Sequence, residues 1–337
     1  MTITREHVAE YLDSLAKPHG SMGRLEGLAI KLAAAQQDLE VRTQPRRIVL
    51  FAGDHGVIES GVSAWPSAVT TVMMETIIAG KATSTALAAA HSADLRLVDV
   101  GSMQPPDHGS EVPSFSDARV SAGTANLATG PAMTKDQFQA AWSVGETEAK
   151  QAHDQGFVLL MAGEMGIGNT TPAACLTMLL AGADADIATG RGAGADDVML
   201  SNKRDIVARS AKRAETLLMD DSVAAIADVA GFEIAAMAGF YTQGARQGSV
   251  LLLDGYVSTA AALIAEHLMP GSTKNMIAAH LSAEPGHRVA LNHLGLEPLL
   301  EWEMRLGEGT GALTALPLLD SAAALLTDVA KLSDIMP

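Results

Sequence analysis

The sequence predicts an α/β protein built on a doubly wound, mostly parallel sheet. Three observations predict this fold class: short apolar runs that end at glycine or an acidic residue, Ala-rich helical stretches between those runs, and a hydrophobic content of 48% against 18% charged residues. Strands of a parallel sheet are covered by helices on both faces, so they read as continuous apolar runs rather than alternating ones. At 337 residues the chain is long enough for one large domain or two closely packed ones.

Helices are expected at both ends of the chain. Apolar residues recur at helical spacing along residues 8–15 and 25–39, and Pro18 and Gly20 break the pattern between these stretches. The segment from residue 320 onward shows the same helical spacing. We therefore expect a small helical lobe formed by residues 1–45 and 312–337, beside a Rossmann-like α/β domain of residues 46–311.

Five apolar runs between these ends are the expected strands of the sheet. They cover residues 48–52, 95–100, 157–162, 250–253 and, as a weaker candidate, 276–280. Each of the first four is followed directly by a glycine or an aspartate. Residues 102–118, rich in proline and serine, are expected to form an exposed loop.

The charge and the cysteine count exclude several classes of protein. With 23 Lys and Arg against 39 Asp and Glu, the net charge is −16, so nucleic-acid and membrane-surface partners, which require clustered basic charge, are not expected. Cys175 is the one cysteine, which excludes an internal disulfide or a cysteine-based zinc site. The charged N-terminal segment lacks the apolar core of a signal peptide, and the apolar stretch 173–183 is too short to span a bilayer. We expect a soluble, cytoplasmic protein.

The loop that follows the third run is the first candidate for a binding site. Ligands of open parallel sheets bind beyond the carboxyl ends of the strands, and residues 163–172 (GEMGIGNTTP) follow one strand and open an expected helix at 172–180. Glycines permit close approach of a ligand, and free N–H groups at a helix start attract an anion. Asn169 stands where a triphosphate-binding loop needs lysine, which favours a monophosphate over a kinase or ATPase function. A tight turn without a ligand is the alternative.

Two further glycine-rich segments follow. Residues 190–197 carry half of a dinucleotide-binding fingerprint, but the third glycine is missing, so we expect no nicotinamide dinucleotide site. Lys203, in the next helix, is either the positive charge that the first loop lacks or an ordinary solvated lysine.

The second of these segments, residues 306–311 (LGEGTG), carries Glu308 between two glycines. Burial of this side chain would raise its pKa toward that of a general base. The alternative is a glutamate that complements a helix dipole. The same two interpretations apply to Glu164.

Other polar pairs and aromatic residues give weaker signals. Asp54 and His55 suggest acid–base chemistry or a metal, but one adjacent pair lacks the spacing of a ligand set, and the 10 histidines form no metal-binding motif. We expect no metal and no cofactor. Trp65 either lines a pocket for a flat ring or packs as an ordinary core residue. The chain has no Gly-x-Ser-x-Gly motif, which disfavours acyl transfer.

Six segments in order along the chain carry a resemblance to a known family. They are residues 17–26 (KPHGSMGRLE), 51–57 (FAGDHGV), 163–172, 253–256 (LDGY), 282–288 (SAEPGHR) and 304–311 (MRLGEGTG). Together they resemble the nicotinate-nucleotide–dimethylbenzimidazole phosphoribosyltransferases, which make the lower-ligand nucleotide of cobalamin. The resemblance implies conversion of nicotinate mononucleotide and a benzimidazole to an α-ribazole phosphate and nicotinate, by a homodimeric enzyme without a metal or cofactor.

The resemblance also implies the roles of individual residues. Glu308 matches the general base that takes a proton from the incoming base, and Glu164 matches a second acid. The residues that match the phosphate and nucleotide site are Gly166, Ile167, Gly168, Asn169, Thr170, Thr171, Gly192, Lys203 and Ser282. Those that match the base pocket are Ala64, Trp65, Val72, Met165 and Leu306.

One departure from the family's pattern leaves the incoming base open. Val72 stands where a glutamine is common, and valine cannot form a hydrogen bond with the base. Adenine, another benzimidazole or a phenol therefore remain alternatives to 5,6-dimethylbenzimidazole. A non-catalytic nucleotide-binding subunit is a further alternative, although the retention of both Glu164 and Glu308 argues against it.

Overall fold

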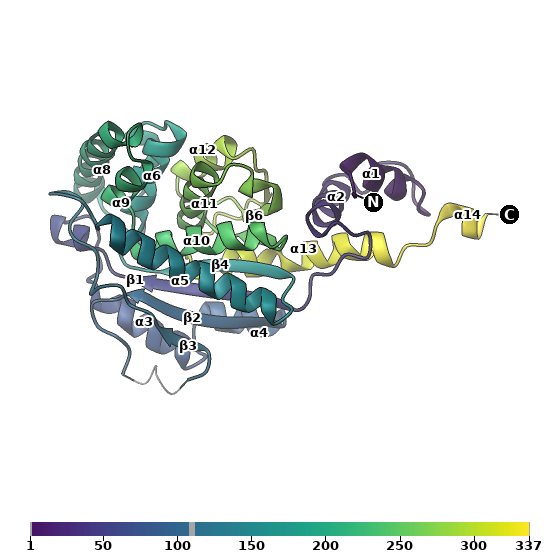
Figure 1. Cartoon of the computed structure of the whole chain (residues 1–337), viewed down its shortest axis with the longest axis horizontal. Helices are drawn as coiled ribbons and strands as arrows, with labels where there is room; N and C mark the ends of the chain where they lie inside the picture. The colour runs from purple at the N-terminus through teal and green to yellow at the C-terminus, as the bar shows by residue number, and fades with distance from the viewer. Residues whose placement is uncertain (1, 108–111, 337) are drawn as a thin grey trace.

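The computed structural model describes residues 2–107 and 112–336, and over these residues it has one parallel sheet of seven strands (Figure 1). The order across the sheet is β3-β2-β1-β4-β5-β6-β7, with every neighbouring pair parallel. The strands are β1 (Arg46–Gly53), β2 (Ala93–Gly101), β3 (Phe115–Asp117), β4 (Leu159–Met165), β5 (Val250–Leu253), β6 (Met276–His280) and β7 (Pro298–Leu300). The predicted α/β fold class is confirmed. Because the strand order reverses between β1 and β4, the crevice beyond their carboxyl ends is the expected place for a ligand.

The five expected strands are all present, and two short ones were missed. β3 and β7 have three residues each, too few for a continuous apolar run to stand out. β3 corrects the expectation that residues 102–118 form only a loop, because Leu97 pairs with Phe115 at this edge of the sheet. The part of that segment at residues 108–111 lies outside the described residues.

Helices cover both faces of the sheet, which is why the strands are apolar on both sides. Alternate residues of β1 enter two cores: Val49 and Phe51 belong to the core on the first face of the sheet, whereas Ile48 and Leu50 belong to the core on the second face. The helices of the first face are α5 (Lys135–Asp154), α6 (Thr170–Ala181), α7 (Ala185–Ala188), α8 (Asp197–Leu218), α9 (Ser222–Val229), α10 (Phe232–Arg246), α11 (Tyr256–Leu268) and α12 (Gly286–His293). Those of the second face and the chain ends are α1 (Arg5–Asp13), α2 (Arg24–Gln36), α3 (Ala68–Ile78), α4 (Thr83–Ala90), α13 (Thr310–Thr327) and α14 (Leu332–Ile335). Within residues 2–107 and 112–336, the short 3-10 helices are η1 (Gly56–Ser60) and η3 (Ser272–Asn275).

The two ends of the chain lie together beyond one end of the sheet (Figure 1). Helix α2 packs along α13, the Tyr11 hydroxyl donates to the Leu326 carbonyl at 3.2 Å, and Leu15 bridges to Lys331. These contacts hold the two ends of the chain together, while the division into a helical lobe of residues 1–45 and 312–337 and a domain of residues 46–311 stays a prediction. Among the described residues, α13 alone is long and apolar enough to cross a membrane, but more than half of it is buried against α2, α4 and β6, as in a core helix.

Candidate active site

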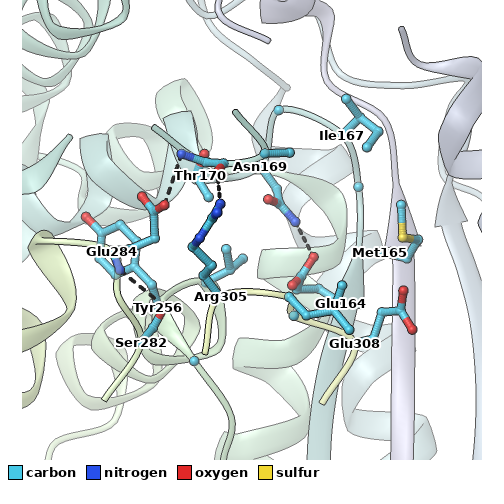
Figure 2. A pocket seen from close by; sticks show the side chains of 18 of the residues that line it. Glu164, Met165, Ile167, Asn169, Thr170, Tyr256, Ser282, Glu284, Arg305 and Glu308 are labelled. Carbon is cyan, nitrogen blue, oxygen red and sulfur yellow. Dashed lines mark hydrogen bonds between the residues drawn. The ribbon is translucent and has the colours of Figure 1, made fainter. Parts of the chain in front are cut away.

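A cavity opens where the carboxyl ends of β4, β5 and β6 meet (Figure 2). Its walls come from the loop after β4, from residues 62–64 and 191–193, from Lys203 of α8, from the start of α11, and from the segments that follow β6 and β7. Segments more than 200 residues apart in the sequence therefore supply the same site, because parallel strands end at one edge of the sheet.

Most of the predicted site residues line this cavity. They are Ala64, Glu164, Met165, Gly166, Ile167, Gly168, Asn169, Thr170, Gly192, Lys203, Ser282, Leu306 and Glu308. Three predicted residues lie outside its walls. Thr171 is buried in the first turn of α6, Val72 is 56% exposed on α3, and Trp65 is 53% exposed on the loop before α3. The Trp65 indole donates to the Ala193 carbonyl at 3.1 Å, so it connects two segments at the cavity rim.

The loop after β4 turns sharply against the end of β1. A side chain on Gly166 would overlap the Gly53 carbonyl, and Gly168 has a φ of +93°, so both positions require glycine. The Ile167 N–H donates to the Thr70 hydroxyl at 3.2 Å, which fixes the loop from α3. Helix α6 begins at Thr170, at the cavity wall. The N–H groups of Ile167, Asn169 and Thr171 already have partners, and Pro172 has no N–H group, which leaves those of Gly168 and Thr170 for a ligand. This geometry suits an anion bound by a few backbone groups together with side chains.

Three carboxyl groups gather on one side of the cavity. Glu164 ends β4, Asp254 directly follows β5, and Glu308 precedes α13; all three are buried. Burial, with the neighbouring charge of Asp254, raises the pKa of Glu164 to about 8. The Asn169 amide, which donates to Glu164, opposes this shift. Burial also raises the pKa of Glu308, and the Asp254 charge adds to the effect. Glu164 is therefore suited to exchanging a proton near neutral pH, and the pKa of Glu308 is shifted in the same direction.

The backbone that carries Glu308 is held in an unusual conformation. Gly307, Glu308 and Gly309 all have positive φ angles, of 90°, 55° and 70°. The Asp254 carboxylate accepts the N–H groups of Gly309, Gly311 and Ala312 at 3.2, 2.7 and 3.1 Å, and so caps α13 directly behind Glu308. Its charge complements the positive end of the helix.

Helix α4 orients the Glu308 side chain. The Ser84 hydroxyl donates to Glu308 Oε2 at 3.0 Å, and both residues are buried. This bond lowers the pKa of Glu308, against the effect of burial. One carboxylate oxygen is thus fixed by a serine from a separate helix.

The opposite side of the cavity carries the cations and N–H groups. Lys203 is 1% exposed and donates to the Thr170 hydroxyl at 2.7 Å and to the Gly190 carbonyl at 3.1 Å. The alternative of a solvated lysine is therefore wrong. Burial lowers the pKa of Lys203 to about 8, against the opposing charge of Glu284. At neutral pH this group is mostly protonated and able to bind an anion.

Glu284 and Arg305 hold the glycine segment that faces Lys203 (Figure 2). Glu284 Oε1 accepts the Gly192 N–H at 3.0 Å, and Arg305 Nη1 donates to the Gly192 carbonyl at 3.4 Å. The Ser282 hydroxyl accepts the Glu284 N–H at 3.4 Å. The Gly192 N–H already donates to the Glu284 carboxylate, so it can donate to a bound phosphate only after that hydrogen bond breaks.

Several residues of the site were given no role from the sequence, among them Ser84, Asp254, Glu284 and Arg305. Asp254 carried one usable signal, its position directly after an expected strand. The contact of Ser84 with Glu308 spans 224 residues and has no local signal. Asp54 and His55 lie outside the cavity walls, and no cluster of three metal-binding side chains was found among residues 2–107 and 112–336.

Comparison with known proteins gives one consistent family. A family model described as phosphoribosyltransferase matches residues 2–335. The chain is 43% identical over 320 residues to a nicotinate-nucleotide–dimethylbenzimidazole phosphoribosyltransferase of Pseudomonas putida, covering 95% of this chain and 90% of that protein. A protein of the same name from Thermus thermophilus is 43% identical over 316 residues, covering 94% and 92%. The crystal structure of CobT from Thermus thermophilus is similar, with a TM-score of 0.93 and 40% identity over 98% of this chain and 97% of that one.

Proposed function

Because the chain belongs to the family of nicotinate-nucleotide–dimethylbenzimidazole phosphoribosyltransferases, we propose that it converts nicotinate mononucleotide and 5,6-dimethylbenzimidazole to α-ribazole 5′-phosphate and nicotinate. One observation carries the proposal beyond family membership. Two buried carboxyl groups with raised pKa values face a cavity whose other wall offers a buried lysine and the N–H groups of a helix start. A proton acceptor and an anion site are the two requirements of this reaction.

Glu308 is the general base of the proposed mechanism. Its carboxylate takes the proton from one ring nitrogen of the benzimidazole, while the other ring nitrogen attacks the anomeric carbon of the ribose. The bond from that carbon to the pyridinium nitrogen of nicotinate breaks, and its electron pair stays on that nitrogen. Attack from the opposite face inverts the configuration from β to α. The leaving group loses its positive charge as it departs, so placement and one deprotonation are the tasks of the protein.

Glu164 is the second acid of the mechanism. It ends β4 next to Glu308, whose N–H donates to the Glu164 carbonyl at 3.3 Å. With a pKa near 8 it holds a proton for most of the time at neutral pH, so we assign it to placement of the base or to secondary proton transfer.

The phosphate of the nucleotide occupies the opposite wall. Within residues 166–171, Gly168 and Thr170 offer backbone N–H groups, while Lys203 offers a positive charge and Ser282 offers a hydroxyl. A local lysine is required because the chain as a whole carries a charge of −16, which repels an anionic substrate.

The apolar part of the cavity is assigned to the base. Ala64, Met165 and Leu306 line it, whereas Trp65 and Val72 lie at or beyond its rim. A flat, apolar benzimidazole suits such a wall. The family resemblance also predicts a homodimer in the cytoplasm, and in a dimer the exposed Trp65 and Val72 side chains are candidates for the subunit interface.

Nicotinate release tests the proposed function. Nicotinate mononucleotide is incubated with the protein, with and without 5,6-dimethylbenzimidazole, and the products are identified by mass. Release that depends on the benzimidazole, together with the mass of α-ribazole phosphate, supports the proposal. If nicotinate is released with adenine, another benzimidazole or a phenol but not with 5,6-dimethylbenzimidazole, the protein performs the same transfer to a different base. No release with any of these bases supports a non-catalytic nucleotide-binding subunit.

A further inference from the structure

A buried pair of titratable side chains lies behind the glycine loop, outside the cavity. His55 follows the end of β1, and Glu233 stands in the first turn of α10. His55 Nε2 and Glu233 Oε1 are 2.8 Å apart, and the two side chains are 1% and 0% exposed. Neither residue has a part in the proton transfer or the phosphate contacts described above.

Three backbone segments close directly around this pair. A side chain on Gly231, the residue before α10, would overlap the His55 ring and both Glu233 carboxylate oxygens. A Cβ on Gly53 would lie 2.9 Å from Glu233 Oε2, and one on Gly166 would lie 3.2 Å from His55 Nε2. The end of β1, the start of α10 and the loop after β4 therefore meet at His55 and Glu233.

The surroundings of His55 favour its charged form. Burial alone lowers the pKa of His55, but the Glu233 carboxylate in contact with it and the nearby Asp54 carboxylate together raise it above its ordinary value. The other acid of this region is Glu164, whose own pKa is raised partly by the charge of Glu233.

The same loop has a second support from behind. The Ile167 N–H donates to Thr70, and Asp54, next to His55, accepts the Met103 N–H at 2.8 Å. Gly56 in turn donates its N–H to the Thr124 carbonyl at 3.2 Å, which fixes the backbone beside His55. The bond of Ile167 thus holds the loop itself, while those of Asp54 and Gly56 fix the backbone on either side of His55.

We propose that His55 and Glu233 are positioning residues for the nucleotide: a buried imidazolium–carboxylate pair, neutral as a whole, that fixes the loop of residues 166–171 from behind. The proposal rests on the assignment of that loop to the phosphate. It predicts that loss of either partner weakens binding of the phosphate group, because the N–H groups of the loop lose their fixed orientation. Binding of the base, on the other side of the cavity, depends on the pair much less.

The test compares variants of the pair with a matched pair elsewhere. His55→Gln and Glu233→Gln each remove one charge and keep a polar side chain, and the double variant removes both charges, so no buried charge is left unpaired. Glu148→Gln is the control, because Glu148 is 5% exposed and pairs with Arg96 at 2.9 Å, away from the cavity walls. The readouts are the KM of each substrate, kcat, and calorimetric titration with inorganic phosphate.

We expect the single variants, and the double variant if a single one fails to fold, to raise the KM for nicotinate mononucleotide and weaken phosphate binding by at least about tenfold. The KM for the base changes by less than about threefold, and Glu148→Gln leaves both KM values unchanged. Nitrogen NMR of the histidine rings measures the protonation of His55, whose signal is identified by its loss in His55→Gln. In the wild type we expect a protonated His55 ring at pH 7. A neutral ring, wild-type phosphate affinity in a folded variant, or equal shifts of both KM values overturns the inference.

The phosphate titration separates this inference from the proposed function. A wild type that binds phosphate but releases no nicotinate contradicts the proposed reaction, and the comparison with His55→Gln then still tests the pair. A wild type that turns over normally, with His55→Gln variants that bind phosphate equally well, contradicts the pair alone. A wild type that binds neither phosphate nor nucleotide overturns both.

Discussion

The two walls of the cavity obtain their charge in different ways. The wall with Glu164, Asp254 and Glu308 consists of side-chain carboxyl groups whose burial raises the pKa of two of them. The wall with Lys203 combines one buried cation with the N–H groups of a glycine loop and a helix start. A proton acceptor must change its charge during turnover, whereas an anion site must keep its charge. Burial acts on both walls: it raises the pKa values of two carboxyl groups on the first, and on the second it lowers the pKa of Lys203 to about 8, which still leaves the lysine mostly charged at neutral pH. The difference teaches that burial prepares the first wall for proton exchange, while fixed dipoles add to the charge of the second.

This division predicts separate kinetic effects for the two walls. Changes on the carboxyl wall should alter kcat, because they act on proton transfer. Changes on the lysine wall should alter the KM of the nucleotide, because they act on binding in the ground state. The following variants test the division, from the largest expected effect to the smallest.

Glu308→Ala removes the proposed general base. We expect kcat to fall by roughly 10²–10⁴-fold, since this is the range that a positioned general base contributes, and the KM for the nucleotide to stay within about threefold. Steady-state kinetics of nicotinate release measures both values. Glu297→Ala, which changes a carboxylate with an 83% exposed side chain, is the matched control and should leave kcat unchanged. A Glu308→Ala enzyme with an unchanged kcat would show that Glu308 is not the general base.

Lys203→Met removes the buried cation of the other wall and keeps most of the side-chain volume. We expect the KM for nicotinate mononucleotide to rise by roughly 10–100-fold with a smaller change in kcat, because a charge-assisted contact to the phosphate is lost. Lys212→Met, on the same helix with a side chain that is 77% exposed, serves as the control. A decrease in kcat with no change in the KM for the nucleotide would show that Lys203 acts in the chemical step and not in nucleotide binding.

Glu164→Gln tests whether burial raises the pKa of the carboxyl wall. A carboxyl group whose pKa rises from 4.5 to about 8 on folding contributes most stability below pH 4.5, and this contribution is lost as the pH rises to about 8. The glutamine variant does not titrate, so its melting temperature should exceed that of the wild type by a few degrees more at pH 8 than at pH 5. Thermal melts of both proteins at the two pH values measure this difference. An equal difference at both pH values would contradict the raised pKa.

Ser84→Ala gives the smallest expected effect. Loss of one hydrogen bond to Glu308, worth about 1 kcal/mol, should lower kcat about fivefold. Because this bond lowers the pKa of Glu308, its loss should also move the acid limb of the pH profile of kcat to higher pH. Thr85→Ala, in the same helix but bonded only to the Ala82 carbonyl, is the control and should leave the limb in place. A shift to lower pH would contradict the proposed effect of Ser84.

Local sequence signals predicted the sheet better than they predicted the site. Every strand of four or more residues was expected, because burial on both faces produces an apolar run; β3 and β7 are too short to produce one. Glu164 and Glu308 could be identified because glycines flank or precede them at strand or helix ends.

The rest of the site depends on contacts between distant segments. Ser84 reaches Glu308 across 224 residues, and Glu284 reaches Gly192 across 92, so no local pattern marks either contact. The burial of Lys203 also depends on packing of α8 against α6, which composition does not reveal. The resemblance supplied the roles of Lys203 and Ser282, while the positions of Trp65 and Val72 outside the cavity walls could be seen only in the fold.

Helix α13 joins the catalytic loop to both ends of the chain. It begins two residues after Glu308, and its 18 residues extend about 27 Å to the place where Tyr11 contacts Leu326. We expect a displacement of the terminal helices to be transmitted along this helix to Glu308, the proposed general base. Tags or truncations at either terminus, though remote from the cavity, are therefore expected to change activity.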